Sequence, residues 1–478
     1  MWLAVPSKYM KKFYTDSEID KLISEIGIDS VDRLYTDIPD DMFVDLDLMD
    51  GMDEEMLFRN QYRSLKKNKS IYEYASFLGD GFYNHYVPPI VDELVSRSEF
   101  LTAYTPYQPE INQGVLKALF EYQSMVTELS DMEVSNSSMY DGASALGEAC
   151  RFSARIHEGD ELIIPASMSP VKKAVIKNYI KGMNINLVEA PFDVKTGKII
   201  PEKVKKIIND KTIGMVVQSP NRFGIIENIT TSLRDILGNR VYIFDGNPLS
   251  LALLKTPGEV GADVYVGEGS IFGSHMNCGG PLIGIFSTKK EYIRKMPGRI
   301  IGATHDVKGK QSFCMTLQTR EQHIKREHAT SNICTNNALI AIAFGIYLSI
   351  KGPDGLKKVA IQSVKNAHKL SERIASVPGF IAPYFTGEFF NEFVYKTPFD
   401  TSIIINRLFQ KKIFGGIAMT DNEILGMGNV LISNKIDIDN SINKNYILSA
   451  ATEMNTENEI DLYAKVLRDI NVSSINIR

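Results

Sequence analysis

The 478-residue sequence lacks the features that mark zinc-binding, disulfide-stabilised and membrane-spanning proteins. Its four cysteines, Cys150, Cys278, Cys314 and Cys334, are widely spaced and include no C-x-x-C pair, so free thiols in a reducing cytosol are expected. No apolar stretch reaches the roughly 20 residues of a membrane span. The short apolar start of residues 1–18 lacks a signal-peptide pattern, which favours a cytoplasmic protein.

A strong charge of one sign is also missing. The net charge is -5 at pH 7, and the 44% hydrophobic and 23% charged fractions are typical of a globular protein. No basic excess favours binding to nucleic acid or to an anionic membrane. A chain of this length exceeds one simple core, so one large and one smaller domain are expected.

The most informative absence is a lysine, because none occurs between Lys255 and Lys289. A buried-strand run just before this interval ends at Asp245, and a second run, Val264–Val266, leads into a glycine-rich loop. A third run leaves that loop as a further predicted strand. Many α/β enzymes hold a cofactor between an acidic strand end and the loop of a neighbouring strand.

From residue 112 onward, helical and strand-like patterns alternate. Asn112–Leu129 has helical spacing and a second helix is expected from Ala143. The expected strands are ELIIP, INLVEA, IGMVVQSP and VYIFDG, and the helices between them are VKKAVIKNYIKG, Pro201–Ile208 and TTSLRDILG. This alternation predicts right-handed βαβ units and a mostly parallel sheet with helices on both faces.

Three parts are predicted along the chain. They are an N-terminal helical arm with an irregular acidic segment (1–59), a large α/β domain (60–350) and a small α+β domain (351–478). Thr15 and Glu18 form a weak capping box in the arm, and residues 56–76 are expected to be helical. Residues 77–111 are predicted to form an irregular binding segment, and two helices are expected in 321–351 and 356–376.

Two strand-end or helix-start motifs are candidate cofactor contacts. Residues Tyr140–Ser144 could form a phosphate cup at a helix N-terminus, although the motif by itself is better explained as a helix N-cap at Asp141 or Ser138. Asp245 could hold a protonated ring nitrogen, as pyridoxal phosphate requires, or it could be a turn aspartate before Gly246.

Two further segments are candidate binding surfaces. In TAYTPYQPE, Tyr104 and Tyr107 could present phenols to a polar substrate, although tyrosines more commonly pack a loop onto the core. In Arg320–Asn336, a basic cluster precedes Thr330, Ser331 and Asn332 at an expected helix start, which could bind a phosphate or carboxylate. The alternative is a solvated cationic face with an ordinary cap. His85 and His275 are better explained as structural or exposed histidines.

Several long strings agree in order with one family. They are SFLGDGFYNHYVPPIVDELVSRSEFLTAYTPYQPEINQG, SMYDGASALGEA, RKMPGRIIGAT and REQHIKREHATSNICTNNAL. Together they resemble the glycine-cleavage P-protein, glycine dehydrogenase (decarboxylating). The resemblance covers about residues 60–350 and includes GGI and ATEMNTENEID, whereas 37–56 and 421–446 look unlike the family. The length is similar to that of subunit 1, the N-terminal half in the two-chain form.

The resemblance implies the aspartate-aminotransferase fold of pyridoxal-phosphate enzymes (fold type I). It also implies decarboxylation of glycine and transfer of the aminomethyl group to the lipoyl arm of H-protein, with the cofactor as electron sink. A lysine normally holds this cofactor, on the loop two strands along from the aspartate. Here that loop, GEGSIFGSHMN, has no amine. The resemblance therefore implies that subunit 2 supplies the lysine, in a hetero-oligomer with two copies of each subunit.

On this interpretation no residue of this chain reacts covalently. The residues expected to face the substrate at the interface are Tyr104, Tyr107 and Gln108, and those expected to reach the partner-bound phosphate are Thr330, Ser331 and Asn332. A vestigial cofactor site would comprise Gly142, Ser144, Asp245 and His275. No metal, nucleic acid or membrane is expected to bind.

Two other interpretations stay open. A self-sufficient pyridoxal-phosphate aminotransferase would use Lys255 or Lys289, but the first follows Asp245 by only ten positions and the second begins a charged TKKEY turn. A non-catalytic scaffold subunit would lack the lysine as well.

Overall fold

The computed structural model describes residues 16–44, 47–48, 51–228, 231–277, 279–425 and 445–475. The chain divides into two compact units, Met1–Asn68 and Lys69–Arg478. The boundary expected at 350/351 between a large and a small domain stays a prediction.

The first unit contains the predicted helical arm. Its helices are α2 (Asp16–Ile26) and α3 (Glu54–Leu65), with short 3-10 turns between them at Val31–Tyr35 and Asp40–Met42. The Asp53 carboxylate caps α3 by accepting the Met56 N–H at 2.9 Å. The prediction of a helix to residue 76 is wrong beyond Leu65, where closely spaced lysines begin and like charges on one helix face repel. Thr15 lies outside the described residues.

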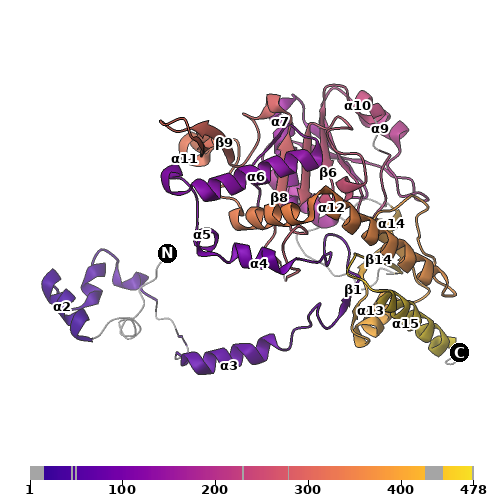
Figure 1. Cartoon of the computed structure of the whole chain (residues 1–478), viewed down its shortest axis with the longest axis horizontal. Helices are drawn as coiled ribbons and strands as arrows, with labels where there is room; N and C mark the ends of the chain where they lie inside the picture. The colour runs from indigo at the N-terminus through magenta and orange to yellow at the C-terminus, as the bar shows by residue number, and fades with distance from the viewer. Residues whose placement is uncertain are drawn as a thin grey trace. The chain divides into compact units, whose positions relative to one another are not determined.

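A mostly parallel sheet forms the centre of the second unit, as predicted (Figure 1). Within the described residues it has seven strands in the order β2-β8-β7-β6-β5-β3-β4. These are β2 (Val134–Ser135), β3 (Glu161–Pro165), β4 (Asn186–Ala190), β5 (Thr212–Gln218), β6 (Val241–Asp245), β7 (Val264–Glu268) and β8 (Gly284–Thr288). Strands β3 to β7 run parallel, and β8 is antiparallel to both of its neighbours.

Helices cover both faces of this sheet. They are α6 (Gln113–Ser130), α7 (Gly142–Ile156), α8 (Pro170–Tyr179), α9 (Pro201–Ile207), α10 (Thr231–Leu237) and α12 (Ala338–Ala375). Tyr242 and Phe244 share a core with α6 and α12, whereas Val241 and Ile243 share a core with α7. Alternate residues of a strand point to opposite faces, so the continuous apolar runs reflect burial on both sides.

Helix α12 joins the two helices predicted for 321–351 and 356–376. Gly352, with φ of 59°, interrupts its helical backbone just before Pro353. Its length and composition alone would allow α12 to cross a membrane. However, Ala341, Phe344 and Tyr347 are buried, and the helix lies alongside α6 (Figure 1). We therefore interpret α12 as a core helix.

In the described residues after α12 there are a smaller sheet and three helices. The sheet has the order β11-β14-β13, and the elements are β11 (Glu392–Lys396), α13 (Thr401–Gln410), β13 (Ile417–Met419), α14 (Asp421–Leu425), β14 (Tyr446–Ala450) and α15 (Glu457–Ile475). A further strand, β12 (Ile413–Phe414), pairs in parallel with β1 (Ala75–Ser76), so this pairing joins two segments that are far apart in the sequence. These elements form the predicted α+β arrangement.

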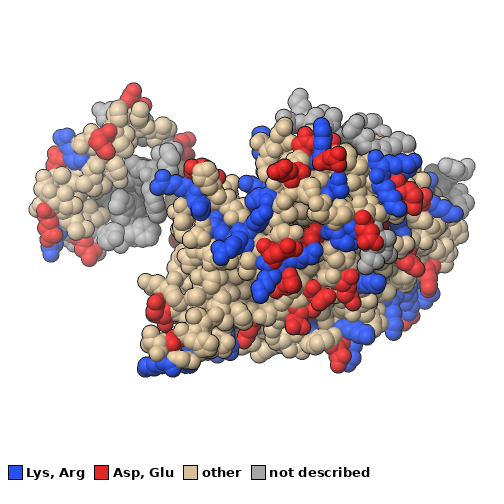
Figure 2. Space-filling model, turned by 90° about the horizontal axis from the view of Figure 1, so that it is seen from above, with Lys and Arg blue, Asp and Glu red and all other residues tan. Residues whose placement is uncertain are grey.

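The segment expected to lack regular structure contains two short helices, α4 (Pro89–Val95) and α5 (Ser98–Leu101). That expectation is wrong here because Pro89 occupies the first position of α4, where a missing N–H costs no helical hydrogen bond. Apart from short 3-10 helices, the other described elements are the hairpin β9 (Ile300–His305) and β10 (Gln311–Thr316) and the short helix α11 (Gln322–Lys325). On the face seen in Figure 2, basic and acidic side chains are intermixed over the larger body.

Candidate functional site

A cavity of about 400 Å³ opens at the carboxyl ends of the parallel strands. We call it the strand-end cavity. Its walls come from the ends of β5, β6 and β7, the first turns of α7 and α8, the loop 80–83 and the start of β11. This is where open α/β sheets bind their ligands, so the cavity is the first candidate site.

The predicted phosphate cup forms one wall of the cavity, but the N–H groups of Gly142 and Ser144 and the Ser144 hydroxyl already have partners within the chain. Asp141 is the N-cap of α7, and its carboxylate accepts both the Ser144 N–H and the Ser144 hydroxyl at 2.8 Å. The Gly142 N–H donates to Oε2 of Glu268 at 2.9 Å. A Cβ at Gly142 would lie 2.9 Å from the backbone nitrogen of Glu268, so only glycine permits this approach.

Glu268 was not predicted from the sequence as a site residue. It is the last residue of β7, and its Oε1 accepts the N–H groups of Ser270 at 3.0 Å and Ile283 at 3.1 Å. We call the N–H groups of Gly142, Ser270 and Ile283 the anion cup. Burial raises the pKa of Glu268, while these three donors act in the opposite direction by favouring the charged carboxylate.

Asp245 is half of a buried ion pair, which neither sequence interpretation anticipated. Its side chain is 2% exposed, and Oδ2 lies 2.6 Å from Nζ of Lys172. Lys172 is the third residue of α8, so the helix start aims its ammonium across the strand ends. The strand-end cavity therefore does contain an amine, although the loop after β7 does not.

A second group of charges lies at the cavity around Arg222 and Glu392. Arg222 Nη1 lies 2.6 Å from Glu423, and its Nε lies 3.5 Å from Asp80. Glu392 accepts the Tyr83 hydroxyl at 2.8 Å and the Asp80 N–H at 2.9 Å. Burial is the main cause that raises the pKa of Glu392 to about 7.

The histidines and lysines considered in the sequence analysis either line the strand-end cavity or lie outside it. His275 lines the cavity, and its Nε2 is 2.9 Å from Asp92 on α4. Lys289 pairs with Asp263 and Lys255 is exposed, and neither is among the residues that line the cavity. His85 is buried 2.7 Å from Glu453, as expected for a structural histidine.

A second group of predicted residues meets at Arg299, which the sequence alone did not single out. Arg299 is 5% exposed and donates to four oxygens. The acceptors are Thr105 Oγ1 at 3.2 Å, the Tyr107 hydroxyl at 2.9 Å, the Cys334 carbonyl at 2.6 Å and Thr335 Oγ1 at 3.3 Å. We call these five residues the Arg299 junction. It joins TAYTPYQPE to the segment after the basic cluster.

That segment is not a helix start, which corrects the prediction for Thr330, Ser331 and Asn332. Helix α12 begins at Ala338, and residues 331–337 before it have no regular secondary structure. There the side-chain amides of Asn336 and Asn337 donate to backbone carbonyls. Ser331 is buried, and its hydroxyl donates to Glu148 at 2.8 Å.

The remaining predicted interface residues face solvent to different degrees. Asn332 and Gln108 are exposed, Thr330 is partly buried, and Tyr104 is 81% exposed. In the basic cluster, Arg320 is buried and donates to backbone carbonyls, including that of Gly298 at 2.9 Å. The other members of the cluster, His323, Lys325, Arg326 and His328, are exposed, which agrees with a solvated cationic face.

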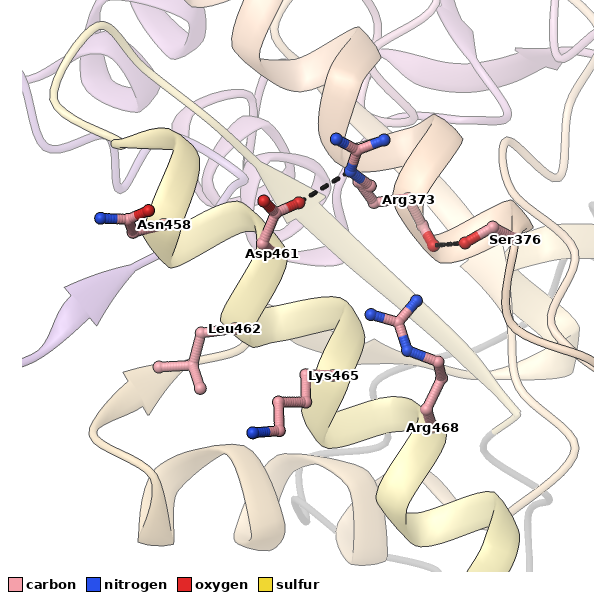
Figure 3. Close-up of a pocket in the computed structure, with 7 residues that line it drawn as sticks. All are labelled: Arg373, Ser376, Asn458, Asp461, Leu462, Lys465 and Arg468. Carbon is pink, nitrogen blue, oxygen red and sulfur yellow. Dashed lines mark hydrogen bonds and ion pairs between the residues drawn. The ribbon is translucent and has the colours of Figure 1, made fainter.

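A wider groove of about 600 Å³ lies between α12 and α15 and contains none of the predicted residues (Figure 3). Arg373 there pairs with Asp461 at 2.7 Å, while Lys465 and Arg468 extend from α15. These are solvated surface charges, which contribute little binding energy individually.

Comparison with known proteins decides the family. The family model described as "Glycine cleavage system P-protein" matches residues 11–444. This chain belongs to the glycine cleavage system P-protein family. The chain is 44% identical over 408 residues to "Probable glycine dehydrogenase (decarboxylating) subunit 1" of Thermotoga maritima, covering 85% of this chain and 92% of that protein. The protein of the same name from Chlorobium luteolum is 39% identical over 95% of this chain and 98% of its own length.

Solved structures agree with the assignment to the P-protein family. A crystal structure of "glycine decarboxylase (P-protein) of the glycine cleavage system, in inhibitor-bound form" superimposes with a TM-score of 0.86 and 34% identity, covering 96% of this chain and 99% of that one. A sphingosine-1-phosphate lyase of Burkholderia pseudomallei shares only the fold, with a TM-score of 0.64 and 13% identity over 91% of this chain and 96% of that one. The fold-type-I architecture expected from the resemblance is confirmed.

Proposed function

We propose that this chain is subunit 1 of glycine dehydrogenase (decarboxylating), the P-protein of the glycine cleavage system. The enzyme decarboxylates glycine and transfers the aminomethyl group to the lipoyl arm of H-protein. Pyridoxal phosphate supplies the electron sink for this reaction when bound. The chain acts in the cytoplasm together with subunit 2, in an assembly with two copies of each.

The Arg299 junction is the observation that supports a direct role in the active site. One buried guanidinium fixes Tyr107 and Thr105 from one segment to Cys334 and Thr335 from another, about 230 positions apart by their numbers. Tyr104 and Gln108, next to these anchored residues, remain exposed. A rigid support beneath exposed polar groups suits a surface that completes a partner's site, because such groups must be held in place.

The strand-end cavity does not fit pyridoxal phosphate. The anion cup holds the Glu268 carboxylate, and Asp245 is paired with Lys172. No lysine lies on the loop after β7. We therefore assign the cofactor and its lysine to subunit 2 and give this chain a positioning role.

The residues of this chain divide into two groups on this proposal. Tyr104, Tyr107 and Gln108 face glycine across the interface, while Thr330 and Asn332 reach toward the partner-bound phosphate. Ser331 is held inward by Glu148, so it supports the segment rather than reaching outward.

Reconstitution with subunit 2 tests the proposal. We expect Tyr104→Ala and Thr330→Ala to reduce glycine–bicarbonate exchange and the affinity for pyridoxal phosphate, while Tyr72→Ala serves as a matched control. Tyr72 is 83% exposed and lies outside both segments. Full exchange and unchanged cofactor affinity in both test variants would contradict the assignment.

A second measurement separates this proposal from a self-sufficient enzyme. The full chain purified alone should contain no cofactor that borohydride fixes to a lysine. A yellow, reducible protein would instead identify this chain as the cofactor-binding one.

A further inference from the structure

We propose that Glu268 closes the strand-end cavity of this chain to phosphate-bearing ligands by placing its own carboxylate in the anion cup. The inference rests on the proposed function and deepens it, since it explains how the cofactor is kept out of the strand-end cavity of this chain. It concerns only residues of this chain, so it can fail while the proposed function stands.

The geometry of the anion cup is that of a phosphate site with an internal ligand. Helix α7 is 15 residues long, and a helix N-terminus of this kind attracts an anion through its free N–H groups and its dipole. The Gly142 N–H is used at 2.9 Å, and the Ser270 and Ile283 N–H groups at 3.0 and 3.1 Å. All three N–H groups donate to one carboxylate, that of Glu268 at the end of β7.

A phosphate would have to displace this carboxylate before it could bind. The carboxylate belongs to Glu268 at the end of β7, within hydrogen-bonding distance of all three donors, so its effective concentration is far above that of any free anion. Even after displacement, a negative side chain would remain beside the bound phosphate and repel it. Glu268 therefore acts against phosphate both by competition and by charge.

The rest of the cavity reinforces this exclusion. Five acidic side chains line it, Asp80, Asp141, Asp245, Glu268 and Glu392, against the two cations Lys172 and Arg222. Both cations are paired with carboxylates. The cavity still measures about 400 Å³, so lack of space is not what excludes a phosphate ester. The excess of acidic side chains in the walls is the remaining cause of the exclusion of phosphate.

Inorganic phosphate is the probe for the test, and the sample is the purified full chain without glycine or subunit 2. We expect Glu268→Ser, which vacates the three N–H groups, to bind phosphate at least about tenfold more tightly than the wild type. Binding would appear as a saturable rise in Tm and as heat in titration calorimetry. Glu268→Gln removes the charge with little change of shape and should also bind phosphate more tightly.

Glu227→Gln is the matched control. Glu227 is buried and, like Glu268, accepts a backbone N–H, from Ile199 at 3.0 Å, but it is not among the residues that line the cavity. It should gain no phosphate binding. A Glu268 variant with a native circular dichroism spectrum but no gain overturns the proposal. Phosphate binding to the wild-type chain that is as tight as binding to Glu268→Ser, or an equal gain in Glu227→Gln, overturns it as well.

Discussion

Replacement of Arg299 should loosen two distant segments at once. Arg299 is 5% exposed and makes four hydrogen bonds to Thr105, Tyr107, Cys334 and Thr335. Each hydrogen bond to a charged group contributes about 1.5–3 kcal/mol, and the contributions are not additive. Arg299 Nε also lies 4.0 Å from the Glu321 carboxylate, whose side chain is 10% exposed. Removing one partner of a buried ion pair costs about 3–5 kcal/mol, which is the loss we expect for Arg299→Ala.

Arg299→Lys is the sharper variant because it keeps the charge. The lysine ammonium has three donors and no planar fork, so it cannot reproduce four bonds in the geometry of a guanidinium. We expect faster hydrogen–deuterium exchange in both 103–108 and 333–336, since one side chain anchors both segments. In enzyme reconstituted with subunit 2, a displacement of about 1 Å at these segments would lower glycine–bicarbonate exchange by about 10²-fold.

The matched control is Arg97→Lys, whose side chain is 57% exposed and pairs with Glu99 at the surface. It should change neither the exchange protection of these segments nor the activity, since exposed pairs contribute little. The reasoning is refuted if Arg299→Lys loosens only one of the two segments. It is also refuted if both segments loosen while the rate of glycine–bicarbonate exchange stays at the wild-type level.

Three further predictions concern buried groups. Burial raises the pKa of Glu392 from 4.5 to about 7, so the folded chain binds this proton more tightly than the unfolded chain. The free energy of unfolding should therefore fall, by about 3 kcal/mol at most, as the pH rises from 4.5 to about 7. Glu392→Gln should remove this decline in urea melts measured across a pH series. Gly142→Ala should destabilise the chain by about 1–3 kcal/mol in thermal melts, because its Cβ would lie 2.9 Å from the Glu268 backbone nitrogen. Ser331→Ala should cost about 1–3 kcal/mol in the same assay, because Glu148 loses the hydroxyl it accepts at 2.8 Å.

The sheet and its helices could be predicted from the sequence because their signals are local. The run VYIFD has apolar residues on both faces and becomes β6, with Tyr242 and Phe244 on one side and Val241 and Ile243 on the other. Burial on two faces is encoded by adjacent residues, so a single sequence is enough to recognise it.

The charged contacts of the site could not be predicted because they join residues far apart in the chain. Lys172 and Asp245 are 73 positions apart, and Gly142 and Glu268 are 126 apart. The sequence places each residue at a helix start or a strand end. It does not specify which neighbouring strand end a long side chain will reach, because that depends on the strand order β7-β6-β5 and on the position of α8.

The start of α12 illustrates a local signal that was overridden. Thr330, Ser331 and Asn332 are good capping residues before an apolar run, yet the helix begins six residues after Asn332, at Ala338. Asn336 and Asn337 instead donate their side-chain amides to the carbonyls of distant loops. Those carbonyls come from tertiary structure, so capping propensity alone placed the helix start too early.

The lysine missing from the loop after β7 is not the only feature that keeps a cofactor out of the strand-end cavity. An amine is present, because Lys172 lies 2.6 Å from Asp245, but that ion pair occupies the aspartate that a cofactor ring would need. The carboxylate of Glu268 likewise occupies the donors that a phosphate would need. Restoring a lysine to the loop after β7 would therefore not by itself create a cofactor site. Both internal ion contacts would first have to be removed, so we expect such a single substitution to leave the chain colourless when pyridoxal phosphate is added.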